Sequence, residues 1–291
     1  MTPQAQKLKK ALQEQGFNIY DLAVMTADTR EEIICTPCNR LNNSYSIAKL
    51  FINTIIGMLE TEGRLKLDDF ITDILRPELK FSYDSIWDTA TLRHALSHSL
   101  GLTHGCFDVD RDDPQSYGTE DYLYYIFSHP PAKSPGTFHL YTDCAHYLLS
   151  RIITQITGHP ADEIIQTRIC NPLQFYPSAW QRCPRGCTIG SSGAFLRSQD
   201  LVKLGWLYMN HGIYENQRLL PEDWIKAAEK EQFDLYPLRG TGGFIGKAGI
   251  CGQMLAYSRS LEIAVCWHGF ETREKNLRSF ILEAIHSIYQ N

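Results

Sequence analysis

The sequence predicts an α+β fold, in which a mostly antiparallel sheet is flanked by N- and C-terminal helices and carries an inserted, all-helical subdomain. Strand-like runs stand near both ends of the 291-residue chain, and amphipathic helical patterns lie outside them. Between residues 64 and 185 the pattern changes to helices and long loops. We therefore expect a discontinuous sheet domain from residues 1–60 and 186–291, a mostly helical subdomain at residues 61–185, and an active site in the cleft between them.

The first 60 residues predict one amphipathic helix, two strands and one buried helix. Residues 4–15 have apolar side chains on one side, as in a helix that covers a sheet. Strand patterns follow at Ile19–Thr26 and Glu31–Cys35, separated by a polar turn. From Ser46 to Glu60 apolar residues cover most of the circumference of a helix, which predicts burial.

The remainder of the chain predicts helices, two more strands and a terminal helix. Proline and glycine at 130–131 and 134–136 mark loops within the helical part. The expected helices are 145–156, 199–211, 221–230 and 272–289, and the expected strands are Ile245–Ser258 and Leu261–Trp267.

Composition and charge exclude several classes of function. Hydrophobic residues make up 43% of the chain and charged residues 21%, as in ordinary globular proteins. A net charge of −5 and a pI near 6.1 give no electrostatic basis for binding nucleic acid or an anionic membrane. No apolar run has the length of a membrane span, and the N-terminus has no signal peptide pattern. We therefore expect a cytoplasmic protein that acts on a small molecule.

Cysteines and histidines do not combine into a recognisable metal or redox motif. The nine cysteines are expected to be reduced thiols, and Cys35-Thr-Pro-Cys38 lacks the second pair that a zinc site needs. His94 and His98 are expected four residues apart on one helix, near His104, but no glutamate completes an HExxH motif. The sequence therefore predicts neither a metal site nor a cofactor.

Lys49 is the first candidate for chemistry, because it interrupts the apolar run Ile47–Ile52. An unpaired charge buried at this point would cost several kcal/mol. Extension of the side chain to the surface is the alternative, which is weakened because Lys49 lies in the first helical turn. Ser46 stands three residues earlier on the same helix face, at a helix N-terminus that favours negative charge on oxygen. A desolvated lysine with a lowered pKa would help to deprotonate this hydroxyl.

Two distant segments strengthen this pairing. Lys247-Ala248-Gly249-Ile250 begins a predicted strand, where small residues would let a substrate backbone lie along the edge. The glycine-rich residues before it have the wrong spacing for a phosphate loop. Pro135-Gly136 leads to Tyr141 and Asp143 on a loop before a helix. S-x-x-K combined with a K-T-G element is a known pairing in β-lactamases and penicillin-binding proteins.

In this order of motifs the chain resembles the class C β-lactamases, the DD-peptidases among the penicillin-binding proteins, and the related family VIII-type esterases. Further similar segments are Asn43–Leu79, Thr91–Leu102 and Gly193–Leu220, and about four-fifths of the chain can be followed in this way. No G-x-S-x-G motif occurs, which disfavours an α/β-hydrolase.

The resemblance implies the roles of individual residues. Ser46 would be the acylated nucleophile, and Lys49 and Tyr141 would share the proton transfers. Lys247 would shape the electrostatics beside Tyr141. The backbone N–H groups of Ser46 and Ile250 would form the oxyanion hole.

Two positions depart from the family pattern and affect substrate choice. Asp143 replaces the usual asparagine, so it only accepts hydrogen bonds; it would raise the pKa of Lys49 or select an amine-bearing substrate. Ala248 replaces the threonine or serine whose hydroxyl meets a substrate carboxylate in the family. Ala248 and Gly249 would therefore form a substrate-binding edge that has no hydroxyl. We therefore expect an esterase or amidase of small acyl substrates. The alternatives are a peptidase of D-amino-acid or amine-bearing peptides, a β-lactamase, or a slow penicillin-binding sensor module.

Overall fold

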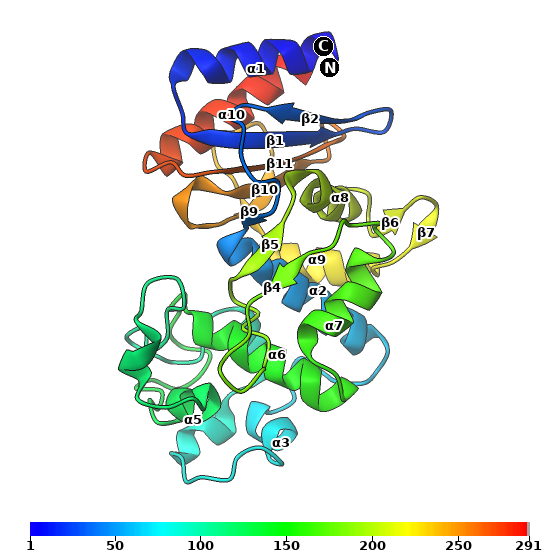
Figure 1. The fold of residues 1–291 in the computed structure, drawn as a ribbon. Helices are drawn as coiled ribbons and strands as arrows, with labels where there is room; N and C mark the ends of the chain where they lie inside the picture. The colour runs from blue at the N-terminus through cyan, green and yellow to red at the C-terminus, as the bar shows by residue number, and fades with distance from the viewer. Residues whose placement is uncertain (290–291) are drawn as a thin grey trace.

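The computed structural model describes residues 1–289 and confirms the predicted α+β fold, with a six-stranded antiparallel sheet at one end of the molecule (Figure 1). The strand order is β2-β1-β11-β10-β9-β8. The strands are β1 (Ile19–Met25), β2 (Arg30–Ile34), β8 (Tyr236–Pro237), β9 (Ile245–Ala248), β10 (Met254–Ser258) and β11 (Ile263–Gly269). N-terminal β1 pairs directly with C-terminal β11, from Ile19 opposite Gly269 to Met25 opposite Ala264, so the sheet is discontinuous in sequence.

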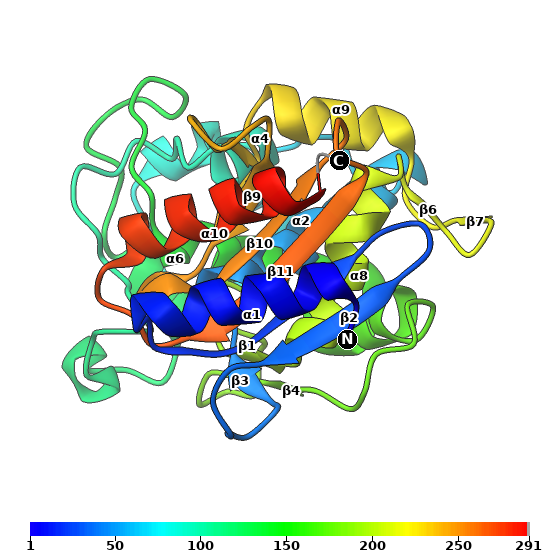
Figure 2. The ribbon, with the colours of Figure 1, turned by 90° about the horizontal axis from the view of Figure 1, so that it is seen from above.

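The two terminal helices cover one face of this sheet. Helices α1 (Pro3–Gln15) and α10 (Glu274–Tyr289) lie side by side across the strands (Figure 2). Leu8 of α1 and Ile281 of α10 share one buried cluster with Val24 and Val265 of the sheet. Helix α8 (Ser198–Met209) packs on the opposite face, against β1, β10 and β11. Both faces are therefore removed from water, which explains why β10 and β11 are buried throughout their length.

One predicted strand is wrong. The expected continuous strand Ile245–Ser258 is two antiparallel strands, β9 and β10, joined by a 3₁₀ turn at Ile250–Gly252. Cys251 and Gly252 have φ angles of 63° and 90°, which a strand does not allow. The turn places Lys247 and Ala248 at the end of β9 and brings Ile250 onto a tight corner. Hydrophobic periodicity does not reveal such a reversal, because both strands are apolar.

The middle of the chain forms the other end of the molecule (Figure 1). Two long helices, α2 (Ala48–Thr61) and α6 (Asp143–Thr157), are largely buried and contact one another. The remaining helices are α3 (Ile71–Leu75), α4 (Leu92–Leu96), α5 (Tyr122–Phe127), α7 (Ala161–Ile165) and α9 (Glu222–Lys230). Short strands β3 (Asn42–Asn43), β5 (Ala194–Leu196) and β4 (Ala179–Trp180) form a second sheet, and β6 (Ile213–Tyr214) pairs with β7 (Gln217–Arg218). One hydrophobic core includes residues of α2, α6, α8 and β10, which belong to both of the predicted domains. This shared core does not mark a boundary, and the domain boundaries at residues 60 and 185 remain a prediction.

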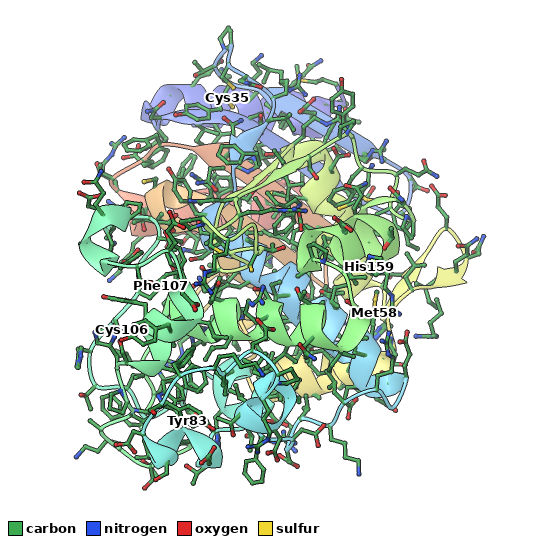
Figure 3. All side chains as sticks on the ribbon, turned by 60° about the horizontal axis from the view of Figure 1, so that its bottom comes forward. Cys35, Met58, Tyr83, Cys106, Phe107 and His159 are labelled. Carbon is green, nitrogen blue, oxygen red and sulfur yellow. The ribbon has the colours of Figure 1, made fainter. Side chains whose placement is uncertain are left out.

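The cysteines are free thiols and are spread over both ends of the molecule. Cys35 lies at the sheet end, whereas Cys106 lies in the helical part (Figure 3). Burial raises the pKa of Cys35 to about 11, the opposite of what a reactive thiolate requires. Within the described residues no helix is both long and apolar enough to cross a membrane.

Candidate active site

Ser46 and Lys49 meet at the start of α2. Ser46 lies in a 3₁₀ turn, Tyr45–Ile47, that leads into the helix, and the preceding Tyr45 has a left-handed backbone with φ of 47°. Such a conformation is rare for a tyrosine and is typical of functional sites. The ammonium Nζ of Lys49 donates a hydrogen bond to Ser46 Oγ at 3.1 Å. The two residues are therefore on one face of the helix, as their spacing predicts.

Lys49 is fully buried and paired. Its Nζ lies 2.6 Å from Oδ1 of Asp143, at the start of α6, and donates to the carbonyl of Ser191 at 2.8 Å. Burial alone would lower the pKa of Lys49, but the charge of Asp143, with contributions from Tyr141 and Asp234, outweighs it and raises the pKa. The expectation of a pKa lowered by desolvation is therefore wrong, and the alternative, in which Asp143 raises it, holds.

Tyr141 and Lys247 form the second half of the constellation. Lys247, on β9, donates from Nζ to the phenol oxygen of Tyr141 at 2.8 Å. Its Nζ lies 4.4 Å from the centre of the Tyr141 ring, and Lys49 Nζ lies 5.0 Å from the same centre. The phenol thus has two ammonium groups nearby, and Tyr141 as a residue is 42% exposed to solvent.

The segment Ala248-Gly249-Ile250 runs beside the turn that carries Ser46. A Cβ on Gly249 would lie 2.7 Å from the carbonyl oxygen of Ser44, so only glycine allows this approach of β9 to the turn before α2. Among residues 1–289, neither the N–H of Ser46 nor that of Ile250 has a hydrogen-bond acceptor. Both donors remain available for a ligand, as an oxyanion hole requires.

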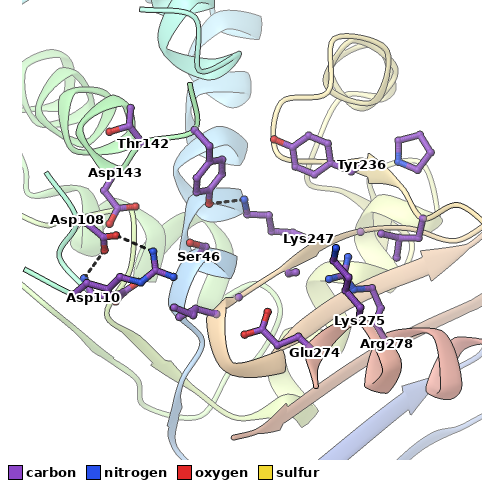
Figure 4. Close-up of a pocket in the computed structure, with 18 of the residues that line it drawn as sticks. Ser46, Asp108, Asp110, Thr142, Asp143, Tyr236, Lys247, Glu274, Lys275 and Arg278 are labelled. Carbon is purple, nitrogen blue, oxygen red and sulfur yellow. Dashed lines mark hydrogen bonds and ion pairs between the residues drawn. The ribbon is translucent and has the colours of Figure 1, made fainter. Parts of the chain in front are cut away.

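A pocket of about 760 Å³ connects these groups, and its lining includes Ser46, Tyr141, Asp143, Lys247, Ala248, Gly249 and Ile250. Lys49 is buried behind Ser46 and does not line it. Asp108 and Asp110 lie on one side of Ser46, and Glu274, Lys275 and Arg278 lie on the other (Figure 4). The structure therefore brings all the predicted site residues to one place. Carboxylates predominate on one side of Ser46, where Arg111 lies 3.5 Å from Asp108, and cations predominate on the other.

Sequence reasoning missed a buried carboxylate, Asp234, which pairs with Lys247. His98 and His146 also contact it, at 3.4 and 2.9 Å. The signal that drew attention to Lys49, a charge in an apolar run, is present in Phe233-Asp234-Leu235-Tyr236 as well. Asp108 and Asp110 were also missed, because they lie in a loop without periodicity.

The histidines differ from expectation in one respect. Helix α4 ends at Leu96, so His98 lies beyond it with φ of 52°, and His94 and His98 do not share a helix face. His94 closes the N-terminal cap of α4 by accepting from the N–H of Thr91. His98, His146 and Asp234 could offer a cation three ligand atoms within 4.8 Å of one another. The ammonium of Lys247 bonds the same carboxylate, however, so that positive charge is already present.

A second serine has a triad-like environment but is inaccessible. Ser44 Oγ lies 3.0 Å from Nε2 of His268, whose Nδ1 lies 3.8 Å from Asp21. All three side chains are fully buried, and Nδ1 also meets Ser198 at 2.7 Å. This cluster therefore ties β1, β11 and α8 together and offers no nucleophile to a substrate.

Comparisons with known proteins agree with this geometry. The β-lactamase family model matches residues 11–268. Penicillin-binding protein 4 of Amycolatopsis lactamdurans is 28% identical over 137 residues, which cover 46% of this chain and 35% of that protein, so the match spans about a third of the relative's length.

Two solved structures share the fold. A penicillin-binding protein homologue from Caulobacter crescentus superposes with a TM-score of 0.79 at 16% identity, over 99% of this chain and 98% of that one. A D-stereospecific amidohydrolase from a Streptomyces species superposes with a TM-score of 0.70 at 17% identity, over 97% and 98%. The family match over most of the chain carries the assignment: this protein belongs to the β-lactamase family of serine hydrolases.

Proposed function

We propose that this protein hydrolyses a small amide or ester through an acyl-enzyme on Ser46. The observation that carries the proposal is the hydrogen bond from Lys49 to Ser46, in a pocket that Tyr141 and Lys247 also line. Ser46 Oγ attacks the carbonyl carbon, and the N–H groups of Ser46 and Ile250 stabilise the oxyanion. The bond to the amine or alcohol then breaks and the leaving group takes up a proton. Water later cleaves the ester to Ser46 and releases a carboxylic acid.

Lys49 acts in this scheme as a charged hydrogen-bond donor. Because its pKa is raised, it is an ammonium at neutral pH and favours negative charge on Ser46 Oγ. Tyr141 is then the better acceptor of the Ser46 proton. The ammonium groups of Lys49 and Lys247 lie 5.0 and 4.4 Å from the centre of its ring and would stabilise negative charge near the phenol oxygen during the transfer.

The charges of the pocket favour an amide substrate whose acyl part carries an amine. Carboxylate oxygens of Asp108, Asp110 and Asp143 lie within 4.8 Å of one another at the pocket wall. Burial, together with the nearby Asp143 charge, raises the pKa of Asp110, so a cation here would relieve repulsion. Ala248 offers no hydroxyl to a substrate carboxylate. The name of the Streptomyces relative, a D-stereospecific amidohydrolase, is consistent with amide cleavage.

The test combines labelling of Ser46 with a matched substrate pair. A fluorophosphonate probe should modify the peptide that contains Ser46, and Ser46→Ala should abolish the adduct while the circular dichroism spectrum is unchanged. The p-nitroanilide of D-alanine should be cleaved faster than its N-acetyl derivative, because only the first carries an ammonium. Labelling that persists in Ser46→Ala would refute the nucleophile, and equal rates for the two anilides would refute the amine preference.

A further inference from the structure

Asp234 is the centre of a buried hydrogen-bond network below the pocket. Its side chain is fully buried and pairs with Lys247. The other carboxylate oxygen, Oδ2, lies 2.9 Å from Nε2 of His146 and accepts from Asn53 at 3.2 Å. His98 reaches Oδ1 at 3.4 Å. Lys247, Asn53 and His98 thus donate to one carboxylate, and His146 Nε2, which also lies 2.9 Å from Oδ1 of Asn53, is equally close to it. A buried carboxylate with this many donors stays ionised.

The backbone around this network is held in a strained form. Asp234 and His98 have φ angles of 57° and 52°, in the left-handed region. Residues other than glycine adopt it rarely, and such strain collects where a side chain must be aimed at a site. Asparagine tolerates this conformation at least as well as aspartate does, so Asp234→Asn changes the charge without a new backbone penalty.

The histidines contribute donors and no charge. Burial lowers the pKa of His98, and it lowers the pKa of His146 to about 4, so both rings are neutral near pH 7. Nδ1 of His98 accepts from the N–H of Thr142, which leaves its Nε2 to donate to Asp234. The His98 ring also lies 4.4 Å from the ring of Tyr141. The network therefore holds Tyr141 on two sides, through Lys247 and through His98.

We propose that Asp234 is a positioning residue, which keeps Lys247 as an ammonium directed at the Tyr141 phenol and prevents Lys247 from binding a substrate carboxylate. The inference rests on the proposed acyl-enzyme function of this pocket. Lys247 donates to both Asp234 and Tyr141, and it is only 3% exposed. An ammonium that is already neutralised by a buried carboxylate attracts a second anion only weakly. Ala248 beside it offers no hydroxyl, so a substrate carboxylate finds no partner in either residue, and the cations left on this side of the pocket include Lys275 and Arg278, further along the lining.

The pH dependence of acylation tests whether Asp234 keeps Lys247 as an ammonium directed at the Tyr141 phenol. Without the Asp234 charge, the buried Lys247 side chain loses the anion that stabilises its charged form. The rate at which a fluorophosphonate labels Ser46 should then fall at alkaline pH. We expect the alkaline limb in Asp234→Asn to lie about one pH unit or more below that of the wild type. The other groups that face this network are Lys49, Asp143, Tyr141, Tyr236, His98 and His146, and all are retained in the variant.

Asp200→Asn is the matched control. Asp200 is also a buried carboxylate, which accepts from Lys203 at 2.9 Å and from Arg197 at 2.7 Å, and it does not line the pocket. This variant loses a comparable ion pair, and its pH profile should match the wild type. An unshifted profile in folded Asp234→Asn, or an equal shift in Asp200→Asn, would overturn the inference. A wild-type protein that is not labelled at all would instead refute the proposed function.

Whether Asp234 prevents Lys247 from binding a substrate carboxylate is testable in the wild-type enzyme, even if Asp234→Asn does not fold. Benzylpenicillin carries a carboxylate, and its methyl ester is the neutral counterpart. The wild type should be acylated by the methyl ester at least as fast as by the acid, and Asp234→Asn should raise the relative rate of the acid about threefold or more. A tenfold wild-type preference for the acid would overturn the inference.

Discussion

The carboxylate of Asp143 lies 2.6 Å from the ammonium of Lys49, and both side chains are buried beneath Ser46. This ion pair joins the start of α2 to the start of α6, and it raises the pKa of Lys49. A neutral amide at the same position would still accept a hydrogen bond from Lys49 but would not hold it as a cation. The pair therefore gives Lys49 an electrostatic function and leaves proton acceptance to the exposed phenol of Tyr141.

Lys49→Ala should lower both stability and acylation. It leaves Asp143 buried without its counterion, and removal of one partner of a buried ion pair generally costs about 3–5 kcal/mol. Urea unfolding should show this loss, and adding Asp143→Asn to Lys49→Ala should recover part of it. Labelling of Ser46 should be slower by about 100-fold or more in both variants. A Lys49→Ala variant as stable as the wild type would contradict the stabilising role of the buried ion pair between Lys49 and Asp143.

Tyr141→Phe should reduce acylation without affecting the fold. Tyr141 is 42% exposed and the substitution removes only its hydroxyl, which accepts from Lys247, so the free energy of unfolding should change by less than about 1 kcal/mol. Loss of a group that transfers a proton lowers a rate by about 10²–10⁴-fold. Stopped-flow labelling with the same probe measures this effect. A rate within threefold of the wild type would exclude Tyr141 from proton transfer.

Asp143→Asn should change substrate choice. It removes one of the three clustered carboxylates and introduces a neutral amide of the same size. The preference for the free D-alanine p-nitroanilide over its N-acetyl derivative should fall about tenfold, which corresponds to about 1.4 kcal/mol of lost attraction. The ratio of kcat/KM values for the two substrates measures it. An unchanged ratio would assign amine recognition to Asp108 and Asp110, or to neither.

The pH dependence of stability should carry the contribution of His146. Its pKa is about 4 in the folded protein, against 6.5 for an unperturbed histidine. Between these values the unfolded chain binds a proton that the folded protein does not, so stability is lost as pH falls through this window. The loss is about 3 kcal/mol from His146, and the lowered pKa of His98 adds a loss in the same direction.

His146→Gln should remove the His146 part of this dependence. The difference in unfolding free energy between pH 7 and pH 4.5 should be smaller in the variant by about 2–3 kcal/mol. Urea titrations at the two pH values provide the measurement. If the difference in unfolding free energy between pH 7 and pH 4.5 is the same in His146→Gln and the wild type, His146 binds a proton as readily in the folded protein as in the unfolded chain, and the prediction is wrong.

The contact between Ser46 and Lys49 was predictable from sequence because the two residues are one helical turn apart, so that a local rule links them. The fold was predictable because the strand and helix patterns near both ends are long and regular. Asp234 carries the same signal as Lys49, a charge among apolar residues, but its partner His98 is 136 positions away and no local spacing connects them. The reversal at Ile250–Gly252 escaped detection because Cys251 adopts a conformation to which its residue type gives no clue.

The pairing of β1 with β11 has a consequence for the synthesis of this chain. β11 lies between β1 and β10, so the large sheet cannot be completed before residue 269 has left the ribosome. Contacts between positions so distant in sequence form slowly, and until then β1 has an open edge. The N–H of Ile250 is likewise made long after Ser46. Nascent chains therefore carry Ser46 long before they carry Ile250 and β11, and the pocket around Ser46 should be complete only after residue 269 has been made.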